Sequence, residues 1–129
     1  MAGEAALDST IAIDFLRNES FALERVSQLN EIYLPYPVLG ELLYGAKKSF
    51  NPEKNIKSIR DFTAGCRIVY GNWHICQNYA EIKNDLRAKG SMITENDIWI
   101  AACIIHKNLT LLTRDKHFQN IAGLSMEIW

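Results

Sequence analysis

The feature that most constrains this chain is the alternation of short apolar runs with longer segments of helical periodicity. Strands are predicted at residues 5–7, 32–34, 67–70, 109–113 and 125–129. Strands that alternate with helices are joined by crossover connections, which make the strands parallel and place helices on both faces of the sheet. The sequence therefore predicts an α/β fold, a three-layer α/β/α sandwich with a central parallel sheet.

The intervening segments are predicted to be helical from the spacing of their apolar residues. They are residues 11–15, 21–29, 38–46, 56–62, 73–89 and 98–106, followed by a short turn or helix at 115–118. The second strand stops at Pro35 and Pro37, Pro37 suits the first turn of the next helix, and Gly90 is placed to end the longest helix. The segment 98–106 is apolar nearly all round, which is typical of a buried helix.

A chain of 129 residues with no internal repeat and no Pro- or Gly-rich linker indicates one domain over residues 1–129. No stretch approaches the roughly 18 consecutive apolar residues of a membrane helix. The start, Met1 to Glu4, lacks the basic and apolar segments of a secretory signal, so a cytoplasmic protein without membrane contact is expected.

The cysteines and histidines indicate what kind of metal the chain would bind. The three cysteines are Cys66, Cys76 and Cys103, and they are too dispersed for a disulfide framework or a structural zinc site. The three histidines show no metal-ligand spacing. Any metal would therefore need oxygen ligands, which favours magnesium or manganese over zinc.

Four acidic residues stand at positions where a parallel sheet gathers its chemistry. Asp8 and Asp115 follow predicted strands, and ligands bind beyond the carboxyl ends of the strands in such sheets. Asp97 lies in the first turn of the buried helix, and Glu41 interrupts an apolar helical stretch.

Each acid also has a purely structural interpretation. Asp8 can cap a helix, Asp97 can complete a capping box with Thr94, Asp115 can begin a turn, and Glu41 can be a solvated helix residue. If the four instead converge, their repulsion needs compensation, and a hard divalent cation is the natural one. Sequence spacing alone does not bring them together.

Charge is unevenly distributed although the formal net charge is only −1. Up to Ala46 the balance is two basic against seven acidic residues, or −5, and from Lys47 onward it is twelve against eight, or +4. Lys47, Lys48, Lys54, Lys57 and Arg60 could meet a polyanion, or they form an ordinary solvated helix face.

Four sequence blocks in order resemble the PIN-domain family, specifically the VapC toxins of bacterial toxin–antitoxin pairs. They are LDSTI at 7–11, GELLYGA at 40–46, NDIWIAA at 96–102 and LTRDKHF at 112–118, and the closing 123–129 is also similar. The likeness spans the whole chain.

The resemblance implies an activity and a site. Asp8, Glu41, Asp97 and Asp115 would bind Mg²⁺ or Mn²⁺ and cleave RNA by metal-activated water, leaving a 5′-phosphate and a 3′-hydroxyl. Thr10 and Thr113 match polar positions that border the metal site. The basic residues Lys47, Lys48 and Arg114 are then candidates for contact with RNA.

The resemblance also implies partners: a homodimer, a cognate VapB-type antitoxin that covers the cleft, and a structured RNA substrate, often transfer RNA. Five apolar side chains are either core residues or part of a self-association or antitoxin surface. They are Tyr33, Tyr36, Leu43, Tyr44 and Trp73.

The sequence bears on two alternatives to the nuclease. A receiver-like regulatory domain would carry an adjacent acidic pair after the first strand, whereas Asp8 is followed by Ser9 and Thr10. A catalytically silent PIN-like binding module would act only through protein partners, and the presence of all four acids speaks against it.

Overall fold

The computed structural model describes residues 4–129 and contains one five-stranded parallel sheet in the order β3-β2-β1-β4-β5. The strands are β1 (Glu4–Leu7), β2 (Glu31–Pro35), β3 (Arg67–Val69), β4 (Thr110–Thr113) and β5 (Ser125–Ile128). The helices are α1 (Ser9–Leu16), α2 (Ser20–Ser27), α3 (Tyr36–Lys47), α4 (Pro52–Ala64), α5 (Trp73–Lys89), α6 (Glu95–Lys107) and the 3₁₀ helix η1 (Lys116–Asn120).

Local sequence chemistry accounts for most of the helix ends. Asp8, Asn72 and Thr94 each accept a hydrogen bond from a backbone N–H in the first turn of α1, α5 and α6 respectively. Pro37 lies in the first turn of α3, where its missing N–H costs nothing. Gly90 adopts φ 71° and ends α5 in the left-handed conformation that glycine enters without a Cβ clash.

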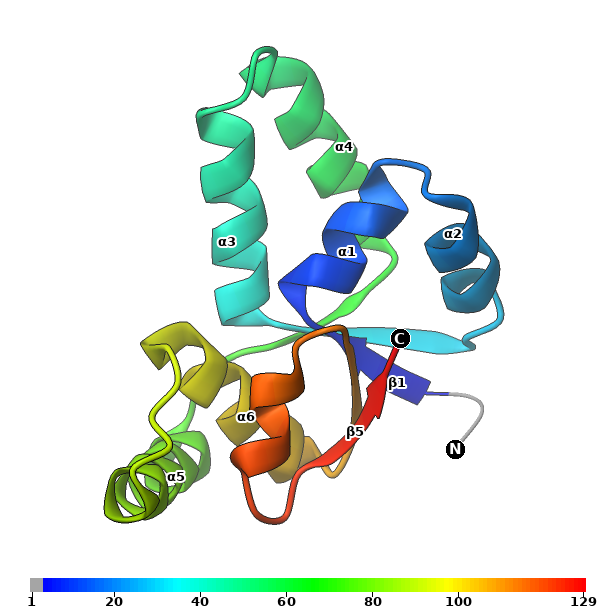
Figure 1. The fold of residues 1–129 in the computed structure, drawn as a ribbon. Coiled ribbons are helices and arrows are strands. Elements are labelled where there is room, and N and C mark those ends of the chain that lie inside the picture. Colours follow the sequence, from blue (N-terminus) through cyan, green and yellow to red (C-terminus); the bar gives the residue numbers. More distant parts are fainter. Residues whose placement is uncertain (1–3) are drawn as a thin grey trace.

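The helices lie in two layers on opposite sides of the sheet (Figure 1). Helices α1 to α4 cover one face, with α3 and α4 forming a hairpin that projects from the body, and α5 and α6 cover the other. The central strand β1 is buried on both faces, since Ala5, Ala6 and Leu7 are all buried. The expected three-layer sandwich is confirmed.

The order in which strands are added to the sheet reverses at β1. From β1 the chain adds β2 and β3 on one side, and it later adds β4 and β5 on the other. The carboxyl ends of β1 and β4 thus flank a switch point, where the following connections leave in opposite directions and open a crevice. Asp8 directly follows β1 and Asp115 lies two residues beyond β4.

The sequence-based elements agree with these bounds, apart from small shifts at their ends. The third helix begins at Tyr36 rather than at Val38, because Pro37 is accommodated inside its first turn. Residues 1–3, on which the expectation of no secretory signal partly rested, lie outside the described residues. Over residues 4–129, no helix is both long and apolar enough to cross a membrane.

Candidate functional site

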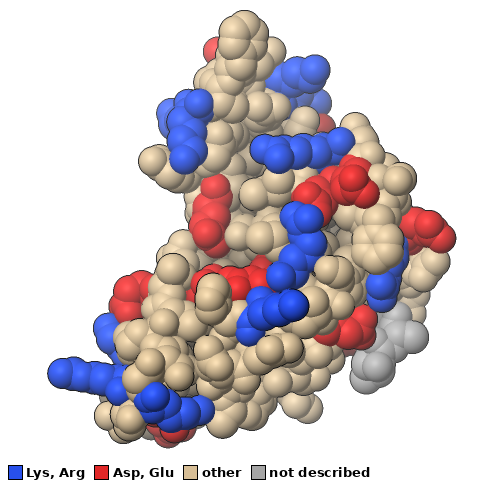
Figure 2. All heavy atoms as spheres, viewed as in Figure 1, with Lys and Arg blue, Asp and Glu red and all other residues tan. Residues whose placement is uncertain are grey.

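A hollow between the α3–α4 hairpin and α6 collects acidic side chains. Figure 2 shows red carboxylate atoms in the recess between the upper and lower parts of the molecule, with blue basic atoms on the surfaces around it. The recess lies at the switch point of the sheet, where β1, β4, α3 and the start of α6 meet.

Asp8 is the most deeply buried of the four acids, with 3% of its surface exposed. Its Oδ1 accepts hydrogen bonds from Thr10 Oγ1 at 2.6 Å and from the Ile11 N–H at 3.3 Å. Its Oδ2 accepts a hydrogen bond from the hydroxyl of Thr113, which is fully buried. Burial raises the pKa of Asp8 above its usual value, and these donors oppose that rise by favouring the charged form.

Glu41 points from α3 toward the same recess. Its Oε1 is shielded from solvent and meets no donor with hydrogen-bond geometry among the described residues. Burial raises the pKa of Glu41, and the negative charges of Asp97 and Asp8 raise it further, although Ser9 and Asn96 favour the ionised form. A buried carboxylate oxygen without a donor is costly, and either protonation of Glu41 or a positively charged ligand relieves that cost.

Asp97 connects the other three acids electrostatically. It is half-buried in the first turn of α6, where its N–H donates to Thr94 Oγ1 at 3.3 Å. Burial raises the pKa of Asp97, and Asp115 and Asp8 add to that rise. The charges of Asp115 and Asp8 therefore act on Asp97, and the charges of Asp97 and Asp8 act on Glu41.

Asp115 occupies the loop after β4 and is held from two sides. Its N–H donates to Thr113 Oγ1 at 2.9 Å, so that hydroxyl links Asp8 with Asp115. Its Oδ1 accepts from the His117 N–H at 2.9 Å and lies 2.9 Å from His117 Nδ1. His117 also lowers the pKa of Asp97, so its ring acts on that carboxyl as well as contacting Asp115.

The donor set suits a hard divalent cation, because all four candidate ligands are carboxylates and one buried oxygen has no donor. The side chains are nevertheless not arranged around a common point. Over residues 4–129, no three Asp, Glu, His or Cys side chains are gathered as the ligands of one ion. The oxygens of Asp8 and Asp115 accept hydrogen bonds from hydroxyl and amide groups, and Asp115 also contacts the His117 imidazole.

The predicted basic residues lie outside the recess. Lys47 and Lys48 are exposed at the end of α3, and Lys48 Nζ lies 4.5 Å from the ring centre of Tyr44. Arg114 is next to Asp115 in sequence, but its guanidinium pairs with Asp14 Oδ2 at 3.0 Å. Arg114 is therefore partly neutralised.

The sequence left two interpretations for five apolar side chains, core packing or an exposed protein-binding surface. Four of the five are exposed, so core packing is wrong for these four. They are Tyr36, Leu43, Tyr44 and Trp73. Tyr44 and Trp73 expose 66% and 74% of their surfaces. The fifth, Tyr33, is partly buried against the core.

Several residues of the recess were not identified from the sequence. Ser9 and Asn96 approach Glu41, His117 holds Asp115, and Arg17 lines a hollow of about 220 Å³ beside Glu41. Ser9 and Asn96 could have been found as the polar neighbours of Asp8 and Asp97 in sequence. Arg17 gave no such signal, because it lies at the end of α1 and only the packing of α1 on α3 places it at the same hollow as Glu41.

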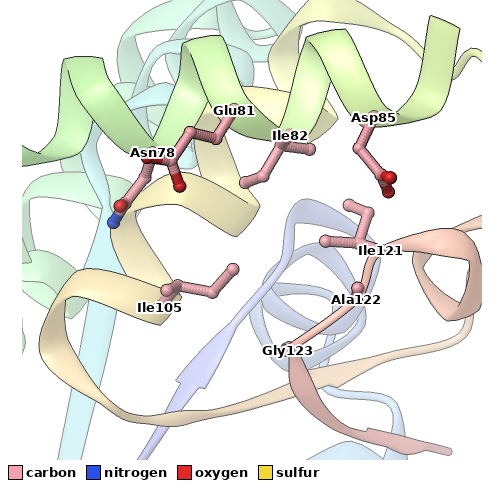
Figure 3. Close-up of a pocket in the computed structure, with 8 residues that line it drawn as sticks. All are labelled: Asn78, Glu81, Ile82, Asp85, Ile105, Ile121, Ala122 and Gly123. Atoms are coloured by element: carbon pink, nitrogen blue, oxygen red, sulfur yellow. The ribbon is translucent and has the colours of Figure 1, made fainter. Parts of the chain in front are cut away.

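A second hollow, of about 260 Å³, lies between α5, the end of α6 and the segment after η1 (Figure 3). Ile82, Ile105 and Ile121 line it, and Glu81 and Asp85 stand on its α5 side. Asp85 pairs with Lys89 at 2.9 Å. None of the four candidate acids lines this hollow, so we assign no chemistry to it.

Comparison with known proteins gives a consistent relationship over the whole chain. The model of the PIN domain matches residues 5–124. Ribonuclease VapC1 of Haemophilus influenzae (strain R2866) is 34% identical over 128 residues, which cover 95% of this chain and 96% of that protein.

Two further relatives extend the comparison. The tRNA(fMet)-specific endonuclease VapC of Shigella flexneri is 26% identical over 126 residues, covering 95% of this chain and 96% of that protein. Among solved structures, VapBC2 from Rickettsia felis bound to a DNA fragment from their promoter matches with a TM-score of 0.89 and 30% identity, covering 98% of each chain.

Proposed function

Since this chain belongs to the PIN-domain family, we propose that it is a metal-dependent endoribonuclease, the toxin component of a VapBC-type toxin–antitoxin pair. The similarity to a protein named ribonuclease VapC1 supports the nuclease assignment. The observation that carries it is Glu41 Oε1, a buried oxygen without a donor, in a recess where Asp8 and Asp97 raise the pKa of Glu41.

The proposed cofactor is Mg²⁺ or Mn²⁺, held by Asp8, Glu41, Asp97 and Asp115. When bound, such an ion neutralises the carboxylates, lowers the pKa of water and stabilises negative charge on the phosphate and the leaving oxygen. Hydroxyl groups of the chain prepare the recess for it. Burial raises the pKa of Asp8, and the hydrogen bonds that Thr10 and Thr113 donate oppose that rise and fix the direction of the carboxylate.

The proposed substrate is RNA, hydrolysed to a 5′-phosphate and a 3′-hydroxyl. The name of the Shigella flexneri relative makes a transfer RNA the first substrate to test. Lys47, Lys48 and Arg114 carry positive charge near the recess, which favours a polyanion, although Arg114 shares its charge with Asp14.

The proposed partners are a second copy of the chain and a VapB-type antitoxin. The solved VapBC2 structure supports the antitoxin, because its toxin-like chain has the same fold over 98% of this chain. The exposed Tyr36, Leu43, Tyr44 and Trp73 supply apolar area of the kind that protein interfaces bury.

One observation favours a second candidate, a PIN-like binding module without catalysis. The acids in the described part of the chain are not gathered as the ligands of one ion. A module of this kind would keep the antitoxin and lose the reaction, so an activity assay separates the two functions.

The test compares RNA cleavage by the wild type, Asp97→Asn and Glu81→Gln, each with Mg²⁺, with Mn²⁺ and with EDTA. We expect the wild type and Glu81→Gln to cleave only with a divalent ion, since Glu81 is an exposed carboxylate of α5. Asp97→Asn should lose cleavage by at least about 100-fold while circular dichroism shows it folded. Equal cleavage by the wild type and Asp97→Asn would show that a contaminating nuclease cuts the RNA. The binding module without catalysis would then be the supported function.

A further inference from the structure

The turn between α3 and α4 presents a phenylalanine to solvent. Phe50 is exposed over 105% of its reference surface. The turn beneath it is fixed by side chains: Ser49 Oγ donates to the Ala46 carbonyl at 2.6 Å, and Asn55 Nδ2 donates to Ser49 Oγ at 2.8 Å. Asn51 Oδ1 accepts from the Lys54 N–H at 3.3 Å on the other side. The ring therefore projects from an ordered turn.

The same turn is the most basic part of the chain. Residues 47–60 contain five basic residues and one acidic residue, a balance of +4, so the rest of the chain carries −5 of the formal total of −1. Among the described residues, Lys57 is the one of these five that forms an ion pair, with Asp61 at 3.1 Å. Figure 2 shows blue atoms over this projecting part and red atoms in the recess below it.

The turn is connected to the acidic recess along α3. Lys48 follows Glu41 by seven positions, so the rise of an α-helix puts the two residues about 10 Å apart along the axis. The hollow that Glu41 and Arg17 line also reaches Ser49 and Asn55, the two residues that fix the turn. An RNA strand with one phosphate beside Glu41 can therefore reach Phe50 within a few nucleotides.

We propose that this turn binds an unpaired nucleotide of the RNA substrate, with Phe50 stacked on its base and Lys47, Lys48 and Lys54 meeting the flanking phosphates. The inference rests on the proposed ribonuclease function and adds to it that the substrate is single-stranded next to the cleavage point. Aromatic rings beside basic side chains are the usual platform for single-stranded nucleic acids, because every unpaired base offers a face for stacking.

The composition of the turn favours RNA over a lipid surface. The apolar face of α4 is already used, since Ile59 is buried and Ile56 and Phe62 pack against the core. Phe50 is therefore the one large apolar side chain of residues 49–60 that is free to enter a membrane. A single ring gives little anchoring, whereas it is sufficient to stack on one base.

The test measures binding of a fluorescein-labelled single-stranded RNA of about ten nucleotides by fluorescence anisotropy in EDTA, so that no cleavage occurs. Phe50→Ala should weaken binding about 5- to 100-fold. Phe50→Leu should weaken it as much, because leucine keeps the apolar surface and loses the ring, and Phe50→Trp should bind as the wild type does.

The charges are tested in the same assay. Replacing Lys47, Lys48 and Lys54 together by Gln should reduce the slope of log Kd against log salt by about 2, since each neutralised phosphate contributes about 0.7 in single strands. Lys107→Gln, at the opposite end of α6 from Asp97, is the matched control and should leave the slope unchanged. A fully paired RNA of the same length should bind equally to the wild type and Phe50→Ala.

The inference would be overturned if Phe50→Ala bound single-stranded RNA as well as the wild type does, or if Phe50→Leu did. It would also be overturned if Phe50→Ala lost binding to anionic phosphatidylserine vesicles and kept its binding to RNA. Its failure is distinguishable from failure of the proposed function. If RNA binding depends on the Phe50 ring but no cleavage occurs with a divalent ion, only the proposed nuclease function is refuted. If the protein cleaves RNA and Phe50→Ala neither binds nor cleaves it less well, only the proposed nucleotide site is refuted.

Discussion

Replacing Thr113 by Val tests whether one buried hydroxyl holds the acidic recess together. Thr113 is fully buried, donates to Asp8 Oδ2 and accepts the Asp115 N–H at 2.9 Å. Valine has nearly the same shape and lacks the hydroxyl, so Asp8 loses a donor and the Asp115 N–H loses its acceptor. A buried hydrogen bond to a charged group contributes about 1.5–3 kcal/mol, and a second bond adds about 1, so the free energy of unfolding should fall by about 2–4 kcal/mol.

The size of the loss should depend on pH in one direction. The Thr113 hydroxyl lowers the pKa of Asp8 by favouring its charged form, so the pKa of Asp8 in folded Thr113→Val is higher than in the wild type. The difference in stability is fully present above that raised pKa. It shrinks as the pH falls through it, because a protonated Asp8 no longer needs the donor.

The assay is urea unfolding followed by circular dichroism in EDTA, at neutral and acidic pH. Thr113→Ser keeps the hydroxyl and should cost only about 1 kcal/mol for the lost methyl group. Thr110→Val is the matched control on the same strand, since Thr110 Oγ1 meets Ser125 Oγ at 3.0 Å at the surface, and it should change stability by less than about 0.5 kcal/mol. Thr113→Val that unfolds with the wild type, or Thr113→Ser that loses as much, would refute the reasoning.

Three other predictions concern the recess and the exposed surface. Without divalent ions at neutral pH, Glu41→Gln should raise the free energy of unfolding by about 1 kcal/mol in urea, because burial and the charges of Asp97 and Asp8 disfavour its ionised form; a loss of stability would contradict this. Mg²⁺ should raise the Tm more at neutral than at acidic pH, since the raised pKa values of Asp8, Glu41 and Asp97 let protons compete with the ion as the pH falls; an equal Tm rise at both values would count against a carboxylate site. Light scattering after size exclusion should give a dimer for the wild type and a monomer for Trp73→Glu, because 74% of Trp73 is exposed in one chain; a wild type that stays monomeric at high concentration would contradict the homodimer.

The types of the elements and the chemistry available to them follow from local patterns of residues. Alternating periodicity gave the parallel sheet and its two helical layers, and helix-capping residues such as Thr94 and Gly90 marked ends that the structure has. The position of Asp8 and Asp115 after strands predicted which edge of the sheet would matter. These are local properties, since they depend on residues within one or two turns of each other.

Which of these residues meet, and how strongly they interact, depends on the packing of the whole chain. The hydrogen bond from Thr113 to Asp8 joins residues 105 apart in the sequence, and it exists because β4 is placed beside β1 in the sheet. The buried Oε1 of Glu41 and the full exposure of Phe50 depend likewise on how α3 and α4 pack on the rest of the chain. Burial and the proximity of like charges depend on contacts between segments that are far apart in the sequence, so no local pattern predicts them.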